Sequence, residues 1–434
     1  MKSIWEENIE RSHFSELKGN IQTDVLIIGG GMAGILCAYM LKKQGTDCIL
    51  VEADRICGGI TKNTTAKITL AHGLIYDKLI RCFGKEKAEL YLAAQSEALK
   101  EYEHLSQIVD CDYEKKDSYV YSLCNRHKIE NEIKAINCLG LNADFCDNLS
   151  IPISVAGAVR VTNQAQFNPL KFAYGLAKDL SIYEHTKVTE LAPEFAKTEH
   201  AEIKCEKIIV TTHFPILNKH GAYFLKMYQH RSYVLALDNA PHVNGMYVDE
   251  DERGLSFRNY NNLLLLGGGS HRTGKKGGSY NELQKFVRAN YPNARIITRW
   301  ATQDCMTLDG VAYIGEYSKN TSNLYVATGF NKWGMSSSMV SAMLLSDLVN
   351  GRKNDYQEVF SPSRSILHPQ LAVNAFESLV GLITPTAPRC PHLGCALKYN
   401  AAEHSWDCPC HGSRFTESGE LIDNPATDDK KNMP

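Results

Sequence analysis

Two short apolar runs near the start of the chain flank a segment of helical length. Residues 24–29 (DVLIIG) and 46–53 (TDCILVEA) predict buried strands, and residues 32–43 between them predict a helix. A strand, a helix and a strand in this order form a βαβ unit. Such a unit is typical of a parallel sheet with helices on its faces.

Longer helical segments then precede a series of short β-like runs. Residues 74–108 place leucines among charged positions, which predicts helix. Asn168-Pro169 begins another helix, because Asn caps a helix well and Pro fits its first position. Short runs separated by Asn, Gly and charges predict an antiparallel layer, and they cover 231–237, 245–248, 254–260 and 263–267.

The remaining apolar segments predict a return to a buried sheet. Residues 201–212 alternate and then run apolar, as a hairpin that leads into a buried strand would. Residues 311–314 and 324–328 predict buried strands of the parallel type, and 336–349 predict a buried helix. Residues 350–388 carry four prolines, so we expect part of this stretch to link to a small C-terminal module.

Length and charge narrow the possible classes of protein. The chain has 434 residues, which suggests two to four domains. Its 47 Lys and Arg nearly balance 49 Asp and Glu, so the net charge is −2 and no nucleic-acid partner is expected. Hydrophobic residues make up 44% of the chain, which is too apolar for a disordered protein.

No segment of the chain predicts a membrane span. The longest apolar stretch, 25–41, is interrupted by four glycines, which fits a strand, a turn and a helix better than a bilayer span. The first 14 residues are polar and acidic and lack an apolar signal core. We therefore expect no integral membrane segment and no cleaved secretion signal.

The 14 cysteines fall into two groups. Ten are scattered singly and indicate reduced thiols of a cytoplasmic protein. The other four are bunched near the C-terminus and require another explanation: Cys390, Cys395, Cys408 and Cys410.

A glycine-rich motif joins the first predicted strand to the first predicted helix. Residues 29–34 (GGGMAG) follow the pattern G-x-G-x-x-G, and Glu52 ends the second strand 18 residues after Gly34. In such a motif Gly29 permits the tight turn, Gly31 lets the backbone approach a pyrophosphate, and Gly34 lets the helix pack on the strand. Glu52 would accept hydrogen bonds from ribose hydroxyls. The alternative is a glycine-rich turn without a ligand.

Several further segments resemble the D-amino-acid-oxidase-like flavoproteins of the glycine oxidase and sarcosine oxidase type. They are 52–55 (EADR), 58–61 (GGIT), 63–67 (NTTAK), 309–315 (DGVAYIG) and 327–335 (ATGFNKWGM). With the glycine-rich motif, the resemblance covers roughly residues 20–350. It implies FAD as cofactor.

The resemblance also implies a domain organisation. The fold class is α/β, or α+β over the whole chain, with a Rossmann-like FAD-binding domain and an inserted antiparallel-sheet substrate domain. We place the FAD-binding domain at 20–214 and 300–360 with a helical insert at about 70–150, the substrate domain at 215–299, a linker at 361–387 and a C-terminal module at 388–434. The predicted FAD contacts are Gly29, Gly31, Met32, Ala33, Gly34, Glu52, Ala53, Thr61, Thr64, Thr65, Ala66, Lys67, Val188, Asp309, Gly310, Gly329, Phe330, Trp333, Gly334 and Met335.

The closing flavin motif also has a direct physical interpretation. Gly329 and Gly334 let the backbone lie against a flat ring, and Ser336 can cap the following helix, whose positive end would stabilise a reduced flavin. The other glycine cluster, 267–269 with Gly274, lacks the spacing of a second dinucleotide motif. This disfavours NAD(P)H as a co-substrate.

Cysteine and histidine recur in two C-terminal stretches. CPH at 390–392 is followed, after 15 residues, by CPCH at 408–411, and this pattern resembles a Rieske [2Fe–2S] site. Four Cys and two His at these spacings could also bind Zn²⁺ tetrahedrally. The Rieske resemblance implies thiolate ligands to one iron and neutral imidazole ligands to the other, namely Cys390 and Cys408, and His392 and His411.

The two remaining cysteines fit a closer resemblance, to the disulfide-bearing Rieske proteins of cytochrome bc-type complexes. There the non-ligand cysteines tie the cluster loops together, which implies a Cys395–Cys410 disulfide here. Ser413 stands at the position where these Rieske proteins carry one side chain that donates a hydrogen bond to a ligand sulfur. Phe415 replaces the Tyr that supplies a second donor.

Four residues are candidates for the substrate side of the flavin. Tyr233, Arg258 and His271 lie in β-like runs that should form the wall over the ring, although each also suits packing or a surface role. Asp304 stands about where glycine-oxidase-like enzymes often carry an Arg for the substrate carboxylate, and an acid there would attract a cation. Cys305 is either a covalent flavin anchor, as in sarcosine oxidase relatives, or an ordinary thiol.

These features together predict a FAD-dependent oxidoreductase fused to a Rieske domain. We expect it to oxidise a C–N bond of an amine-like or amino-acid-like small molecule. Electrons would leave one at a time through the cluster to a protein or quinone-like acceptor. Two other hypotheses are reverse flow, in which a donor reduces the cluster and the flavin reduces a substrate, and a non-catalytic redox sensor whose cluster controls a partner.

Overall fold

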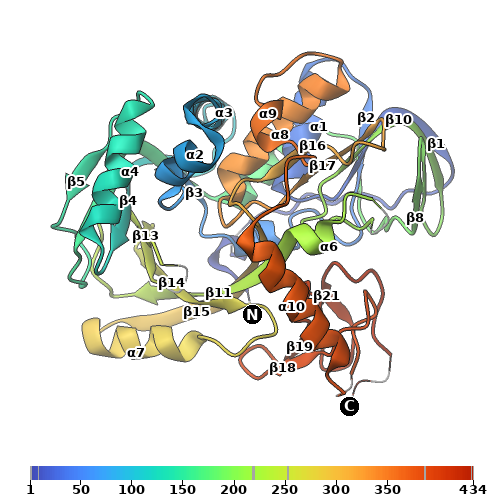
Figure 1. The fold of residues 1–434 in the computed structure, drawn as a ribbon. Helices are drawn as coiled ribbons and strands as arrows, with labels where there is room; N and C mark the ends of the chain where they lie inside the picture. Colours follow the sequence, from blue (N-terminus) through green and yellow to red (C-terminus); the bar gives the residue numbers. More distant parts are fainter. Residues whose placement is uncertain are drawn as a thin grey trace.

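Three sheets organise the computed structural model of the protein, which describes residues 2–7, 9–217, 220–251, 254–385, 388–431 and 433 (Figure 1). The first sheet has eight strands, the second has nine, and the third has four strands near the C-terminus. Figure 1 shows α10 (Pro369–Ile383) leading from the rest of the chain to the four-stranded sheet.

The eight-stranded sheet contains the predicted βαβ unit, which is confirmed. β1 pairs in parallel with β2 on one side and with β10 on the other, and α1 (Met32–Lys43) connects β1 to β2. The main path of the sheet is β16-β17-β10-β1-β2-β7, and β8 and β9 extend it beside β10. Its strands are β1 (Ile21–Ile28), β2 (Cys48–Val51), β7 (Ile182–Tyr183), β8 (Glu190–Ala192), β9 (Phe195–Lys197), β10 (Glu202–Val210), β16 (Tyr313–Glu316) and β17 (Leu324–Thr328).

One prediction about this sheet is confirmed and one is wrong. The buried strand expected within 201–212 is present as β10, which runs parallel to β1, whereas its hairpin partner β9 lies before this segment. The strand expected at 311–314 is β16, but it pairs antiparallel with β17 instead of parallel. The connection between the two strands is only residues 317–323, which is too short for the crossover that a parallel pair requires.

The nine-stranded sheet draws its strands from two separate parts of the chain. β11 to β14 come from the expected antiparallel runs, whereas β3 to β6 come from 67–166 and β15 extends to Thr307. The sheet is therefore wider than the 215–299 segment. The expected helical insert at about 70–150 does hold three helices, α2 to α4, but it also contributes β4 and β5 to this sheet. Its order is β15-β11-β14-β13-β12-β4-β6-β3, with β5 beside β6, and its strands are β3 (Lys67–Ile68), β4 (Glu114–Ser122), β5 (Asp144–Cys146), β6 (Gly157–Gln166), β11 (Met227–Asp238), β12 (Met246–Asp249), β13 (Ser256–Tyr260), β14 (Leu263–Arg272) and β15 (Arg295–Thr307).

The helices predicted from the sequence are present, and others such as α7 were not predicted. The segment 74–108 forms α2 and α3, and Asn168 caps α5 by accepting hydrogen bonds from the backbone N–H groups of Leu170 and Lys171 at 3.1 Å each. α1 and α8 pack together in the main apolar core. The helices other than α1 and α10 are η1 (Ile4–Glu6), η2 (Ile60–Asn63), α2 (Ile75–Phe83), α3 (Lys85–Ser106), α4 (Arg126–Cys138), α5 (Pro169–Ala177), α6 (Tyr223–Lys226), α7 (Tyr280–Asn290), α8 (Gly334–Val349) and α9 (Gln357–Phe360).

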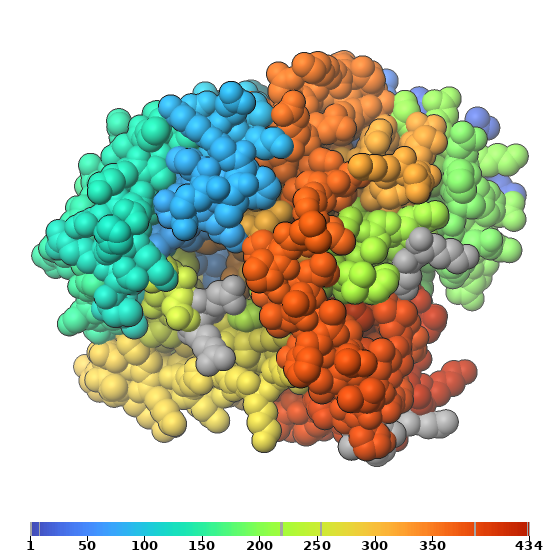
Figure 2. Space-filling view, viewed as in Figure 1, coloured from blue at the N-terminus to red at the C-terminus, as the bar shows by residue number. Residues whose placement is uncertain are grey.

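The segment expected to be a linker contains a helix of 15 residues, α10. Pro369 occupies its first turn, where a missing N–H costs nothing, and the His368 side chain accepts from the Gln370 N–H. Figure 2 shows this part of the chain, in orange-red, on the surface beside the C-terminal module. Its outer face is apolar and exposed at Val373, Phe376, Leu379, Leu382 and Ile383. The module itself is the antiparallel sheet of β18 (Lys398–Asn400), β19 (Ser405–Asp407), β20 (Arg414–Thr416) and β21 (Leu421–Asp423).

Candidate functional site

A cavity of about 580 Å³ extends from the glycine-rich motif to the nine-stranded sheet. One end is formed by the start of α1, and the opposite wall includes residues of β11 and β15. It is lined by most of the predicted FAD contacts: Gly31, Met32, Ala33, Thr61, Thr64, Thr65, Lys67, Gly310, Phe330, Trp333, Gly334 and Met335. The other predicted contacts lie outside this lining: Gly29, Gly34, Glu52, Ala53, Ala66, Val188, Asp309 and Gly329.

The glycines of the motif have the separate roles that the sequence predicts. A Cβ on Gly34 would lie 2.0 Å from the Gly29 carbonyl oxygen, so only glycine lets α1 approach the strand. Gly29 has φ +109°, a backbone conformation that favours glycine. A Cβ on Gly31 would meet nothing closer than 3.5 Å, which leaves open space in front of the helix N-terminus. Such a cradle fits a pyrophosphate held by backbone N–H groups.

Glu52 is fixed beside this cradle. Its carboxylate accepts hydrogen bonds from the backbone N–H of Gly30 at 2.6 Å and of Asp54 at 3.0 Å. Burial raises its pKa, while these hydrogen bonds favour the charged form. The carboxylate is thus placed at the end of β2, where a ribose hydroxyl could donate to it.

Buried donors hold the carbonyl groups of the segment 63–66. Trp5 Nε1 donates to Thr64 O at 2.8 Å, and Trp300 Nε1 donates to Asn63 O at 2.9 Å. Arg258 Nη1 donates to the carbonyl oxygens of Thr65 and Ala66 at 2.6 and 2.7 Å. These contacts fix the backbone that presents Thr64, Thr65 and Lys67 to the cavity.

Arg258 therefore supports the cavity wall and does not contact a substrate. The residue is fully buried and is absent from the cavity lining, contrary to its predicted position over the flavin. Burial lowers its pKa to about 9. Burial and the charge of Arg258 also lower the pKa of the neighbouring Lys67, to about 7.

Tyr233 lies in the cavity wall as predicted, whereas His271 lies outside the cavity lining. Tyr233 borders the cavity, but its ring packs on Tyr280 of α7 and its hydroxyl lies 3.0 Å from His271 Nε2. Tyr233 follows Arg231 at the two-residue spacing that puts side chains on one face of a strand, and Arg231 contacts the C-terminal module. Tyr233 thus lies at the edge of the cavity, and its partner His271 lies outside the cavity lining.

Asp304 is, with Tyr233, a predicted substrate-side residue that the structure places in the cavity lining. Burial raises its pKa to about 6, and the positive charges of Lys332 and Arg231 oppose this shift. Lys332 also lines the cavity. The wall therefore presents an acid and a base, which complements both an ammonium and a carboxylate group. Lys332 lies within the closing flavin motif, but its role was not evident from the sequence.

His72 is a further cavity residue that sequence reasoning missed. Its Nδ1 lies 2.7 Å from Tyr91 Oη, its Nε2 lies 2.9 Å from Ser336 Oγ, and its ring stacks on Trp333 at 4.9 Å. Burial lowers its pKa to about 3, so the imidazole is neutral. Ser336 thus contacts His72 and does not cap α8, whose N-cap residue is Trp333.

Cys305 is not placed to anchor a flavin. It is buried in the apolar core beside Tyr313 and Val326, and it is absent from the cavity lining. Burial raises its thiol pKa well above the usual value.

Two six-residue loops in the C-terminal module share one backbone pattern. Cys390 N–H donates to Cys395 O at 2.8 Å, and Cys408 N–H donates to Ser413 O at 2.8 Å. The fifth residue of each loop is a glycine with positive φ, and its N–H donates to the carbonyl of the first residue at 2.9 Å. A disulfide joins Cys395 to Cys410, as predicted.

The predicted cluster ligands converge between these loops. The ring centroids of His392 and His411 are 5.0 Å apart. Both ring nitrogens of His411 are buried with no hydrogen-bond partner in the described part of the chain. Hydrogen bonds from the thiol of Cys408 and the hydroxyl of Ser413 lower the pKa of Cys390 to about 7. Two adjacent thiols and an unpartnered buried imidazole fit a cluster held by two thiolates and two neutral imidazoles.

The module is fastened to the nine-stranded sheet through polar contacts. Gln303 Nε2 donates to Gly412 O at 2.9 Å, and Gln229 Nε2 donates to Asn424 O at 2.9 Å. Arg231 Nε donates to Glu403 Oε2 at 3.0 Å. The rings of His392 and His411 lie against Phe214 and Phe224, with centroids 6.5 and 6.1 Å apart.

Comparison with known proteins agrees with this arrangement. The chain belongs to the FAD dependent oxidoreductase family, whose model matches residues 24–348, and carries a Rieske [2Fe-2S] domain, which matches residues 357–434. Its cofactors are FAD and a [2Fe–2S] cluster. The Rieske match includes the 361–387 segment that was expected to be a linker.

One relative matches this chain along nearly its whole length. The chain is 34% identical to a protein of Bacillus subtilis (strain 168) named as a Rieske 2Fe-2S iron-sulfur protein, over 98% of this chain and 96% of the relative. The cluster region alone is 49% identical over 37 residues to the cytochrome b6-f complex iron-sulfur subunit of Nostoc punctiforme, which is 8% of this chain and 21% of that protein.

Solved structures share the fold of the larger part. Glycine oxidase from Geobacillus kaustophilus superposes with a TM-score of 0.65 at 18% identity, covering 79% of this chain and 99% of the other. L-proline dehydrogenase from P. horikoshii superposes with a TM-score of 0.67 at 16% identity, covering 80% and 98%. Among the described residues, no helix is both long and apolar enough to cross a membrane.

Proposed function

We propose that this oxidoreductase removes electrons from the C–N bond of an amine-like or amino-acid-like small molecule and passes them through its Rieske cluster to a separate acceptor. The observation that carries the proposal is the position of β11 and β15. These two strands form a wall that the cavity and the C-terminal module share.

Side-chain alternation divides this wall into two faces. Tyr228 pairs with Met306, and Ser232 pairs with Thr302, and all four residues line the cavity. The neighbouring positions Gln229, Arg231 and Gln303 contact the C-terminal module instead. A single sheet thus separates the predicted FAD site from the predicted cluster, a separation suited to electron transfer within one chain.

The cavity residues supply binding and orientation. Asp304 is placed to attract the ammonium group of a substrate, and Lys332 supplies a cation for a carboxylate when the substrate is an amino acid. The α1 N-terminus would hold the pyrophosphate of FAD, and Glu52 its ribose. When bound, FAD supplies a two-electron acceptor at the cavity, and the cluster supplies a one-electron carrier.

An anaerobic titration tests the proposal directly. Purified full-length protein is mixed with a panel of amines and amino acids while flavin and cluster absorbance are recorded together. We expect at least one compound to bleach the flavin and then the cluster. The opposite outcome has two parts: no compound in the panel changes the flavin absorbance, and protein whose cluster has been reduced by a chemical reductant goes on to reduce an oxidised compound at the flavin. That outcome would show that electrons flow in the reverse direction.

A further inference from the structure

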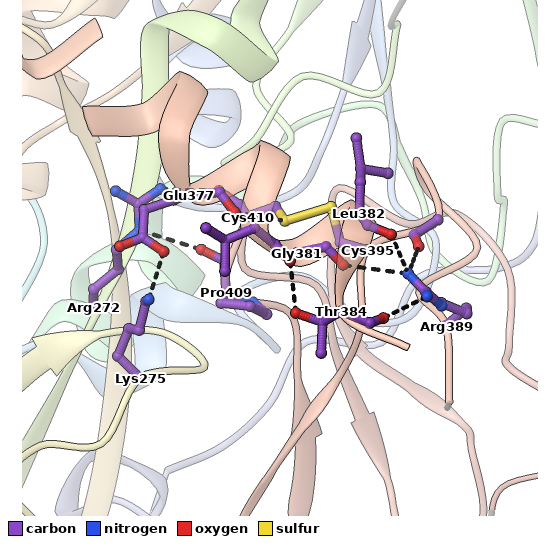
Figure 3. The surroundings of a disulfide bond; sticks show 12 residues. Arg272, Lys275, Glu377, Gly381, Leu382, Thr384, Arg389, Cys395, Pro409 and Cys410 are labelled. Carbon is purple, nitrogen blue, oxygen red and sulfur yellow. Dashed lines mark hydrogen bonds and ion pairs between the residues drawn. A yellow bond between two sulfur atoms is a disulfide. The ribbon is translucent and has the colours of Figure 1, made fainter. Parts of the chain in front are cut away.

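Arg272, the last residue of β14, reaches from the cavity wall to the second cluster loop. Its Nε donates to Pro409 O and its Nη2 to Cys410 O, both at 3.2 Å, and its Nη1 donates to Asn374 Oδ1 of α10 at 2.9 Å. Figure 3 shows the Arg272 side chain directed at Pro409. One side chain thus joins β14, α10 and the loop that carries two predicted ligands.

The same guanidinium also touches the cavity wall. It lies 4.8 Å from the centroid of the Tyr228 ring, and Tyr228 lines the cavity. The backbone is also close here, since a Cβ on Gly274 would lie 2.5 Å from the Pro409 nitrogen. Arg272 is therefore held where the cavity wall and the second cluster loop are in close contact.

The charge of Arg272 is directed at carbonyl groups and at an aromatic face. Among the described residues, Arg272 forms no ion pair within 4.0 Å, and the nearby Glu377 pairs with Lys275 at 2.5 Å. Glu377 acts on Arg272 electrostatically without forming an ion pair with it, and a partly buried cation in this state has an effect over a longer range than a surface ion pair. Pro409 and Cys410 lie between the predicted ligands Cys408 and His411, so this effect falls on the cluster.

We propose that Arg272 is a positioning residue that raises the midpoint potential of the cluster and fixes the second ligand loop against the cavity wall. Reduction adds one negative charge to the cluster, and an adjacent cation stabilises the charged product. The proposal needs the cluster but does not depend on which small molecule the cavity binds.

A redox titration of the full-length protein tests this proposal, with cluster absorbance or its electron paramagnetic resonance signal as the readout. Arg272→Met should weaken the electron affinity of the cluster at least about tenfold, which is 59 mV for a one-electron couple. Arg272→Lys keeps the charge and should retain most of the potential. Arg272→Gln removes the charge but keeps a donor, and replaces the Met variant if that variant does not fold.

Two controls make the result decisive. Lys398→Met removes an exposed cation from β18 of the same module and should leave the midpoint unchanged, because solvent screens it. Iron content is measured in each variant. The proposal is overturned if Arg272→Met or Arg272→Gln keeps full iron and the parent midpoint, or if Arg272→Lys loses as much potential as the uncharged variants.

Discussion

Arg231 of β11 and Glu403 of the C-terminal module form a buried ion pair, with Arg231 Nε 3.0 Å from Glu403 Oε2. The Arg231 side chain is only 2% exposed. Arg414 contacts Glu403, Asp407 and Asp423 at 3.0 Å each. The network thus contains three carboxylates and two guanidinium groups, and one of these guanidinium groups comes from outside the module.

Arg231→Met should destabilise the attachment of the module. Removing one partner of a buried pair typically costs about 3–5 kcal/mol, because the other charge stays buried. We expect a lower thermal midpoint and an earlier loss of cluster absorbance on heating. Adding Glu403→Gln to this variant should recover part of the loss. Arg295→Met, which breaks the exposed pair with Asp238, should leave both readouts unchanged.

Gly31→Val should reduce FAD content about tenfold or more, because its side chain fills the open space in front of α1. The matched control is Gly59→Ala, where a Cβ meets nothing within 4 Å. The ratio of flavin to protein absorbance measures the effect. If the Gly31→Val protein kept its full flavin content, the pyrophosphate of FAD would not lie at this position.

We expect FAD to be bound without a covalent link, because Cys305 is buried outside the cavity lining. Acid precipitation should release the flavin into the supernatant. Yellow colour that stays with the pellet would contradict this prediction. Glu52→Arg should further weaken FAD retention, since it replaces a ribose acceptor with a cationic donor.

The raised pKa of Asp304 gives two opposite pH trends. Its pKa of about 6 in the folded protein exceeds the value of about 3.9 expected in an unfolded chain. Its contribution to the free energy of unfolding is therefore full below about pH 4 and is lost as the pH rises through about 6. Binding of a cationic substrate needs the carboxylate, so KM for an amine should fall over the same rise in pH. Asp304→Asn should abolish both trends, and an unchanged pH profile in this variant would assign them to another group.

The metal content separates an iron–sulfur cluster from zinc. Iron and acid-labile sulfide should each approach about two per chain in protein handled without oxygen. Zinc in their place would contradict the assignment. Cys395→Ser removes the disulfide but leaves the predicted ligands, so the cluster should form and then be lost faster on warming.

Hydrogen bonds to the ligand sulfurs should tune the potential. The Ser413 hydroxyl bonds to the Cys390 thiol, and Phe415 is fully buried beside the cluster cysteines without a hydroxyl. Ser413→Ala should lower the midpoint, and Phe415→Tyr should raise it when the new hydroxyl reaches a sulfur. Voltammetry measures both. A Tyr variant whose structure shows that contact but whose midpoint is unchanged would refute the argument.

The sequence predicted the parts of the site that depend on local backbone geometry. The glycine-rich motif and the two cysteine loops carry their information in consecutive residues, because glycine positions and ligand spacing are local constraints. Asp304 was also predicted as a cavity residue, because glycine-oxidase-like enzymes often carry a residue of opposite charge at about this position.

The positions of Arg258 and His271 could not be predicted in this way. Which face of a strand a residue occupies depends on register and on what packs there, and no local pattern indicated that the C-terminal module covers one face of β11. The same reason explains why β4 and β6 were missed as members of the second sheet. β4 pairs with β12, which lies more than 70 residues further along the chain, and with β6, and no local pattern in the sequence indicates either pairing.

The shared wall of β11 and β15 also constrains how the lengths of these strands can change during evolution. Substitutions on one face can alter the cavity without touching the interface, because the side chains alternate. Inserting or deleting one residue between Gln229 and Ser232 would exchange the two faces, so interface residues would enter the cavity and cavity residues would enter the interface. Functional descendants of this chain should therefore conserve the length of these strands more strictly than the residue types at positions without a contact to the cavity or the module.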